Sequence, residues 1–340
     1  MKDYINKLHL HMFDDTDMTR MNTNVTTQNT VGTDDLSPEM KTYYDKVLLR
    51  AAEPKLVHDQ FGQKRPIPAR GGKTIEFRSF PALPKQTTPL TEGVTPDGQK
   101  LQATAITATI AQYGGYIVSS DLLELTAIDN IMVETAKLLG SQAGRTSDTI
   151  TREVLAAGTN VRYAGDKNAR ANLAATDILT VAEIKKARRD LKVKNAETIN
   201  GDYVAIIHPD AEYDLMNDDE WIDASKYAGS GQIFNGEIGK IFGVRFVEST
   251  EAKIFTQGTI GSGGFYVYGT LVLGANAFGV TSIEGKGIEH IVKQRGSAGV
   301  NDPLNQRSSQ GWKMNKVAKI LEQNYMVRIE HRSTMTSTPT

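Results

Sequence analysis

Apolar residues recur every three or four positions between Ser119 and Ala157, which is the spacing of one buried stripe along an α-helix. Ser119 or Ser120 can cap the start of this helix, and Gly158 can end it. One helix of this length would span roughly 55 to 60 Å, which is more than a compact domain needs. The pattern therefore predicts a long strut, and the alternative is two helices that break near Gly140 to Gly144. The stripe, which skips a turn near Ser147, consists of Leu125, Ile128, Met132, Ala136, Leu139, Ala143, Ile150, Val154 and Ala157.

In the residues before this helix, apolar positions recur at every second residue. Residues 73–80 alternate apolar and polar positions, and residues 101–118 are rich in Thr and other strand-forming residues. The twenty residues between them contain four prolines and two glycines, which deny ladder hydrogen bonds and permit turns. The pattern predicts a β-hairpin with a projecting tip that contacts another molecule, and an enzyme lid is the competing interpretation.

The N-terminal 37 residues are polar, with too few apolar side chains to offset the entropy of ordering, so they are predicted to form an extended arm. Their acidic residues lack the glycine and closing Glu of a calcium loop and are interpreted as a solvated tail. Ser37 and Pro38 predict the start of a short helix that ends near Glu53.

The chain after the long helix predicts alternating helices and strands. Thr180 can cap a helix that runs to Val193, and Tyr203 to Ile207 form a continuous apolar strand that leads into a helix near Pro209. Residues 237–250 predict a helix or turn and then a strand, and further short strands follow from Phe265. His208, at the end of a strand and without metal-spaced partners, is interpreted as structural.

The predicted helix from Val181 is strongly basic on the side away from its apolar stripe. A solvated face is the simplest interpretation, ion pairing with a neighbouring subunit is the second, and nucleic-acid binding is the third. Its basic residues are Lys185, Lys186, Arg188, Arg189, Lys192 and Lys194.

The C-terminal region returns to strand character. Tyr325, Val327 and Ile329 alternate with Met326, Arg328 and Glu330. Trp312 is expected to anchor this region in a core. The last eight residues are predicted to form a frayed tail.

Composition narrows the class of protein. The chain has 340 residues, 39% of them hydrophobic, so it can form two sub-domains with cores. Its 39 Lys and Arg and 40 Asp and Glu give a net charge of 39 − 40 = −1, which argues against avid nucleic-acid binding. The absence of cysteine excludes disulfides and thiolate sites. Neither a membrane-spanning segment nor a signal peptide is predicted.

Known catalytic motifs are absent from the sequence, and no catalytic, cofactor-binding or metal-binding residue is predicted. The glycine-rich run from Gly258 to Gly264 precedes a strand, whereas phosphate-binding loops follow one, so it is interpreted as a turn.

Three runs occur in a characteristic order: residues 89–96 (PLTEGVTP), residues 243–249 (GVRFVES) and residues 302–307 (DPLNQR), the last followed by Gly311-Trp312-Lys313. With these runs, residues 38–332 resemble the major capsid proteins of tailed bacteriophages, which have the Hong Kong ninety-seven type of fold. Within that superfamily the chain looks like the branch found in N-four-like podoviruses. Relatives with a built-in scaffolding region carry about a hundred more residues at the start, so a separate scaffold protein or none is expected.

The resemblance implies an α+β fold with an N-terminal arm, an extended β-hairpin loop, a long spine helix, a peripheral domain and an inserted α/β axial domain. The implied division is an arm with a short helix (1–65), the extended loop (66–118), the spine helix with the first part of the peripheral domain (119–176), the axial domain (177–290), and the second part of the peripheral domain with the tail (291–340).

The implied function is structural. Pentamers and hexamers of this chain would assemble in the bacterial cytoplasm into an icosahedral virion head around double-stranded DNA, which they would contact only weakly. Scaffolding, decoration and portal proteins are the other implied partners, and no membrane or small-molecule substrate is implied. An encapsulin-like cellular compartment and an α/β enzyme with a lid hairpin are the alternatives. The candidates for inter-subunit ion pairs are Arg78, Glu92 and the basic residues Lys185, Lys186, Arg188 and Arg189.

Overall fold

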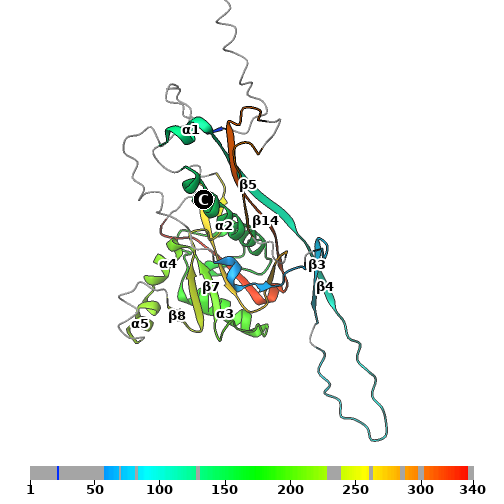
Figure 1. Cartoon of the computed structure of the whole chain (residues 1–340). Coiled ribbons are helices and arrows are strands. Elements are labelled where there is room, and N and C mark those ends of the chain that lie inside the picture. Colours follow the sequence, from blue (N-terminus) through cyan, green and yellow to red (C-terminus); the bar gives the residue numbers. More distant parts are fainter. Residues whose placement is uncertain are drawn as a thin grey trace, which may run out of the picture. The chain divides into compact units, whose positions relative to one another are not determined.

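The computed structural model shows two compact units (Figure 1). Unit 1 comprises Met1–Glu53, Tyr113–Ala143 and Ile288–Met314, and unit 2 comprises Pro54–Gln112, Gly144–Gly287 and Asn315–Thr340. Within these ranges the structure describes residues 21–22, 57–68, 70–80, 83–127, 131–227, 239–259, 263–283, 288–297 and 302–335. The predicted short helix before Glu53 and most of the predicted arm lie outside the described residues.

Unit 2 is built on a seven-stranded mixed sheet with the order β6-β15-β11-β7-β9-β8, in which β10 also pairs with β11. The pairs β7–β9 and β15–β6 are parallel, and the remaining pairs are antiparallel. The strands are β6 (Val161–Tyr163), β7 (Tyr203–Ile207), β8 (Lys240–Ile241), β9 (Val244–Glu248), β10 (Ile254–Gln257), β11 (Phe265–Leu273) and β15 (Met326–His331).

Both faces of this sheet are buried, which explains why β7 is a continuous apolar run. On one face, Ala205 and Ile207 of β7 pack with Ile184 and Leu191 of α3 (Val181–Val193). On the other face, Val204 and Ile206 pack with Leu155 of α2 (Ile131–Ala156) and with Phe278. The sheet is therefore the centre of the hydrophobic core.

The helices begin where the sequence predicts. Thr180 caps α3 by accepting a hydrogen bond from the Glu183 amide, and Pro209 opens α4 (Pro209–Met216). The His208 ring accepts a hydrogen bond from the Asp210 amide at 3.1 Å, so His208 is the N-cap of α4, and its structural role is confirmed. The other helices of unit 2 are α5 (Asp219–Tyr227), η3 (His58–Phe61), η4 (Ala164–Asp166), η5 (Arg170–Asn172) and η7 (Gln323–Tyr325).

A second group of strands in unit 2 pairs with the C-terminal half of β14 (Arg307–Ile320). There β12 (Phe278–Ser282) pairs antiparallel with Lys316–Ile320 and parallel with β2 (Gln63–Lys64). The predicted hairpin is also in unit 2: β3 (Thr74–Ser79) pairs antiparallel with β4 (Thr104–Thr109).

Unit 1 contains β1 (Met21–Asn22), α1 (Asp121–Thr126), β13 (Glu289–Lys293), most of β5 (Ala111–Ser120), and parts of α2 and β14. In this unit β1 pairs parallel with β5, and β13 pairs antiparallel with β14. The Trp312 side chain is 6% exposed, and its ring nitrogen donates to Gln142 Oε1 at 3.0 Å. Gly114 lets β5 approach closely, because a Cβ there would lie 2.7 Å from the Trp312 carbonyl oxygen. The predicted anchoring by Trp312 is confirmed.

The prediction of one unbroken helix from Ser119 to Ala157 is wrong, and so is its alternative. Ser120 caps the short helix α1, which ends at Ala127, where the backbone is extended (φ −67°, ψ 136°). The 26-residue helix α2 then continues through Gly140 and Gly144. A glycine in a helix costs only about 1 kcal/mol, whereas Asp129 and Asn130, which follow the break in sequence, favour helix caps over helix interiors.

One further prediction is partly confirmed and two need correction. For residues 237–250 the predicted turn at Gly243 and the strand after it, β9, are confirmed, and the described residues before the turn form strand β8 instead of a helix. The polar positions of β15 are buried as well as the apolar ones. The predicted frayed tail is wrong at Ser333 and Thr334, because Ser333 donates to the Asp210 carbonyl and Thr334 hydrogen-bonds to the Asp214 carboxylate. The last five residues of that prediction lie outside the described residues.

Candidate assembly surfaces

The Phe77 side chain, which is 4% exposed, packs the β3–β4 hairpin against the rest of unit 2. A Cβ at position 279 would lie 2.8 Å from the Phe77 ring, so Gly279 makes room for it. Beyond this anchor the loop that joins the strands runs out as a long open segment (Figure 1).

Residues 83–105 are all exposed, including several large apolar side chains. The turn at their tip is formed by Gly93, which has a φ of +79°, and by a hydrogen bond from the Val94 amide to the Thr91 carbonyl. Glu92 lies in this turn and makes no salt bridge within the described part of the chain. The exposed apolar residues of the loop are Leu83, Leu90, Val94 and Leu101. None of the described residues of unit 2 covers these apolar side chains.

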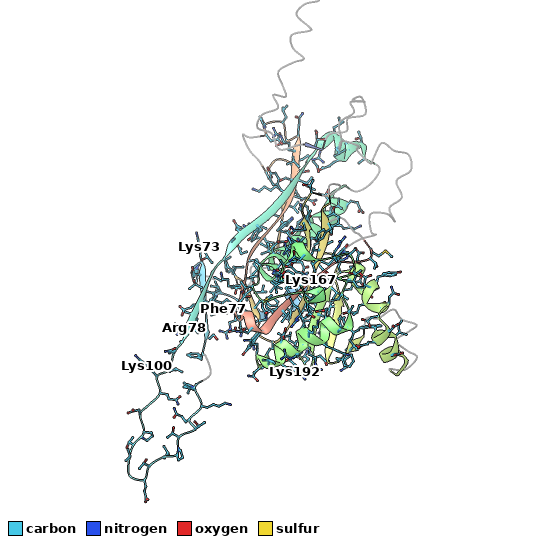
Figure 2. The ribbon with its side chains drawn as sticks, turned by 180° about the vertical axis from the view of Figure 1, so that it is seen from behind. Lys73, Phe77, Arg78, Lys100, Lys167 and Lys192 are labelled. Carbon is cyan, nitrogen blue, oxygen red and sulfur yellow. The ribbon has the colours of Figure 1, made fainter. Side chains whose placement is uncertain are left out.

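Arg78 lies on β3 next to the anchor residue Phe77, as Figure 2 shows. Its Nε donates to Glu76 Oε1 at 2.8 Å, and both side chains are largely exposed. Arg78 also lines a pocket of about 220 Å³ at the base of the hairpin, together with Arg65, Phe77 and Tyr325. An exposed ion pair of this kind contributes little to stability, so Arg78 can exchange its partner at low cost.

Two of the α3 lysines are already paired within the chain. Lys185 Nζ lies 2.5 Å from Glu220 Oε2. Lys186 Nζ contacts Asp166 at 2.8 Å and Glu183 at 2.9 Å, and the hydrogen bond to Asp166 raises the pKa of Lys186. Their first role is therefore to neutralise neighbouring carboxylates.

The C-terminal half of α3 carries basic groups with fewer partners. A groove of about 340 Å³ is lined by Lys185, Arg188, Arg189, Lys192 and Val193. The Arg188 Nε is buried without a hydrogen-bond partner among the described residues, and Arg189 Nη1 lies 3.4 Å from Oδ1 of the adjacent Asp190. The structure therefore brings Lys185, Arg188 and Arg189 together on one groove. Lys186 is instead paired with Asp166. Arg78 and Glu92 lie elsewhere, on the β3–β4 hairpin.

A polar cluster that the sequence did not reveal holds the segment at His58 against α2. The His58 amide donates to Asp148 Oδ1 at 2.8 Å, and the His58 ring nitrogen Nδ1 lies 2.6 Å from Asp148 Oδ2. Lys316 Nζ contacts Asp59 Oδ2 at 2.5 Å and donates to the Ser147 carbonyl. The helical turn at Ser147, where the apolar stripe is interrupted, thus packs through polar contacts instead of apolar ones.

Neither a metal centre nor a membrane span is found in the described part of the chain. Its His, Asp and Glu residues form no group of three or more that could hold a metal ion. No helix among these residues is long and apolar enough to cross a bilayer.

Comparison with known proteins identifies the class. The capsid of Ralstonia phage GP4 matches with 14% sequence identity and a TM-score of 0.68, covering 92% of this chain and 100% of that chain. The capsid of cyanophage P-SCSP1u matches with 16% identity and a TM-score of 0.65, covering 94% and 100%. The head of Helicobacter pylori bacteriophage KHP40 matches with 13% identity and a TM-score of 0.60, covering 94% and 99%. The fold is therefore that of the tailed-phage capsid proteins.

The family model described as phage capsid protein matches residues 103–329. The chain belongs to this family and is a major capsid protein that forms a phage head, which confirms the predicted fold class and function. Its place is the virion capsid. A search of curated proteins finds no match.

Proposed function

We propose that copies of this chain form pentamers and hexamers and that these close into an icosahedral head around double-stranded DNA. The observation that carries the proposal is the long exposed hairpin loop, which has several large apolar side chains that the described residues of its unit leave uncovered. Heterologous contacts between copies close into rings when the rotation between neighbours allows it, and a projecting loop suits such contacts. The net charge of −1 fits a wall that binds packaged DNA only weakly.

The proposed division of the chain follows the resemblance. Residues 66–118 are the extended loop, α2 is the spine, residues 177–290 are the axial domain, and residues 119–176 and 291–340 form the peripheral domain. The buried sheet supports an α/β axial domain, although it also includes β6 and β15 from the neighbouring ranges.

The proposed branch is that of the N-four-like podoviruses. Its three sequence runs lie at the hairpin tip, along β9, and in the loop before β14, where Asp302 accepts hydrogen bonds from the Gln306 and Arg307 amides. The role is structural without catalysis, assembly takes place in the bacterial cytoplasm, and scaffolding, decoration and portal proteins are the further partners.

The proposed inter-subunit ion pairs involve Glu92 at the hairpin tip and Arg188 and Arg189 in the α3 groove. Arg78, Lys185 and Lys186 take part only by exchanging the partners they have in their own chain. Charge reversal tests this assignment: Glu92→Lys and Arg189→Glu are expected to reduce particle yield and stability in salt. Lys319→Glu, which changes an exposed lysine on β14 away from the basic helix, is the control. Unchanged yield in both candidate variants would remove these residues from the interface.

The function is tested by sedimentation of the purified chain, alone and after co-expression with the other head proteins of the same phage. Negative-stain images of the fastest fraction are expected to show rings of five or six, tubes or closed particles. A chain that stays monomeric or dimeric under both conditions would contradict the proposal. A cellular compartment would differ by particles that co-purify with an enzyme cargo.

A further inference from the structure

We propose that the basic groove on α3 binds the acidic start of α5 in a neighbouring copy of this chain. This inference rests on the self-assembly proposed above, and it names the surface that meets Arg188 and Arg189. The acidic start of α5 consists of Asp219 and Glu220, which line a second groove of about 730 Å³. The basic groove is the one lined by Lys185, Arg188, Arg189, Lys192 and Val193.

The acidic groove lies at the start of α3, and the basic groove extends to its end. Thr180, which lines the acidic groove, comes just before the first residue of the helix. Val193, which lines the basic groove, is its last residue, and Lys192 lies at the lower edge of unit 2 in Figure 2. The helix rises about 1.5 Å per residue, so its ends are roughly 18 Å apart. Complementary patches that lie apart on one chain suit a head-to-tail contact, which generates rings.

The basic groove has positive charge that the chain leaves largely unbalanced. Arg188 and Lys192 form no ion pair with the described residues, and Arg189 is 74% exposed. The turn between β8 and β9 supports the Arg188 guanidinium, because a Cβ at Gly243 would lie 3.4 Å from Arg188 Nη2. Three cationic groups are therefore held on one groove and can meet carboxylates from outside the chain.

The acidic groove also has charge that is available to a partner. Asp218 is occupied within the chain, since its carboxylate accepts hydrogen bonds from the Val181 and Glu220 amides. Asp219 is exposed and forms no ion pair with the described residues. Glu220 lies 2.5 Å from Lys185, but these side chains are 51% and 40% exposed. An exposed pair contributes little to stability, so Glu220 can exchange its partner on assembly.

Apolar side chains beside both sets of charges favour a protein as the partner. Val193 is 62% exposed at the basic groove, and Lys185 Nζ lies 4.4 Å from the centroid of the exposed Phe242 ring. The exposed side chains of Tyr213 and Met335 line the acidic groove. Protein interfaces combine Arg with aromatic residues and Met, whereas phosphate backbones are bound mainly through charge. A second copy is the occupant, because this chain itself carries the complementary groove.

Charge reversal and its rescue test the contact. The groove variant carries Arg189→Glu and Lys192→Glu, and the corner variant carries Asp219→Lys and Glu220→Lys. Each is expected to lower the yield of rings or particles on the order of tenfold, because like charges then meet in the contact. A chain with all four substitutions is expected to recover most of the parent yield, since every contact again joins opposite charges. Lys319→Glu is the control for a reversed charge elsewhere, and the circular dichroism spectra of the unassembled chains should agree.

Co-expression of the groove variant with the corner variant gives the second measurement. The groove variant has lost its basic surface and the corner variant its acidic one, so opposite charges meet only where the two chains alternate. Rings with an even number of chains can alternate, and rings of five cannot. Negative-stain images of the mixture are therefore expected to show rings of six, or tubes and sheets built from them, without closed icosahedral particles.

Four results would overturn the inference. They are parent-like assembly of the groove and corner variants, no recovery in the chain with all four substitutions, rings of five in the mixture, and normal shells of the groove variant that have lost only their retention on heparin. The last result would assign the basic groove to phosphate groups. Each of them leaves the proposed function standing, whereas failure of the parent chain to assemble under either condition described above would overturn both.

Discussion

Arg170 and Glu330 form a bidentate ion pair: Arg170 Nε lies 2.7 Å from Glu330 Oε2, and Arg170 Nη2 lies 2.7 Å from Oε1. Glu330 is 0% exposed and also accepts a hydrogen bond from Arg328 Nε at 2.9 Å. Arg328 in turn donates to the carbonyls of Ala156 and Gly158 at the end of α2. One buried carboxylate thus links η5, β15 and the end of the spine helix.

Glu330→Gln should lower the free energy of unfolding by about 3 kcal/mol, because it leaves two guanidinium groups near one another without their buried counter-charge. Chemical denaturation of the unassembled chain measures this. Glu76→Gln is the matched control, since Glu76 forms an exposed pair with Arg78 that is worth less than about 1 kcal/mol. Equal effects of the two substitutions would contradict a structural role for the buried pair.

His331 should make the fold sensitive to acid. Burial lowers its pKa from 6.5 to about 4. Between these values the unfolded chain binds a proton that the folded chain does not, so the free energy of unfolding falls as the pH drops from about 6.5 to about 4. The full loss is about 3 kcal/mol.

Unfolding of the unassembled chain at several pH values measures this loss. His331→Gln should remove most of the slope, and a residual slope of the same sign is expected from His208, whose pKa is also lowered by burial. If the free energy of unfolding depended on pH equally in His331→Gln and in the parent chain, the acid sensitivity would belong to other groups.

Glu212 should have the opposite dependence on pH. Burial, together with the nearby charge of Glu248, raises its pKa from 4.5 to about 7. The folded chain therefore retains a proton that the unfolded chain loses, and its stability falls as the pH rises from about 4.5 to about 7.

Glu212→Gln should stabilise the fold at pH 8 by about 1 kcal/mol after allowance for solvent screening, and by little at pH 4. Melting temperatures at the two pH values measure this difference. Glu248→Gln is a second variant that should weaken the pH dependence, because it removes the neighbouring negative charge. If neither variant were more stable than the parent chain at pH 8, repulsion between the Glu212 and Glu248 carboxylates would be ruled out.

Asp148→Asn should loosen the segment at His58, since Asp148 accepts hydrogen bonds from both the amide and the ring of that histidine. The expected loss is about 2 kcal/mol, which is typical of a buried hydrogen bond to a charged group. Denaturation and limited proteolysis before Val57 measure it. Asp97→Asn, in the exposed hairpin loop, should change neither.

Much of the fold could be predicted because local signals agreed with packing. The alternation of Ile75 and Phe77 predicted β3, the apolar run from Tyr203 predicted β7, and Thr180 and Ser120 predicted helix starts. In each case the residues that define the pattern are also those that the core or the cap requires.

The spine helix was harder to predict because its buried stripe is not entirely apolar. Asp148, Thr151 and Arg152 are buried in its C-terminal half, where partners from distant parts of the chain satisfy them. In the sequence, such buried polar positions look like interruptions of the apolar stripe. The break at Ala127 was missed for a related reason, since an apolar spacing can continue across two separate helices.

The α3 charges show a second limit of sequence reasoning. Composition marks the helix as basic, but only the structure shows that Lys185 and Lys186 neutralise Glu220 and Asp166 whereas Arg188 has a buried nitrogen without a partner. A single sequence gives no signal for ion pairs between residues that lie this far apart along the chain.

The uncharged run from Leu101 to Ser120 has a consequence for how the protein must be produced. A strand-forming segment with neither charge nor proline has the composition that drives amyloid-like aggregation while a chain is still unfolded. Pairing of β5 with β14 covers part of this run in the folded chain, whereas β4 pairs with β3 alone among the described strands. Newly made chains therefore face a kinetic competition between ordered shell growth and precipitation, and a rise in the concentration of unassembled chains shifts it towards precipitation.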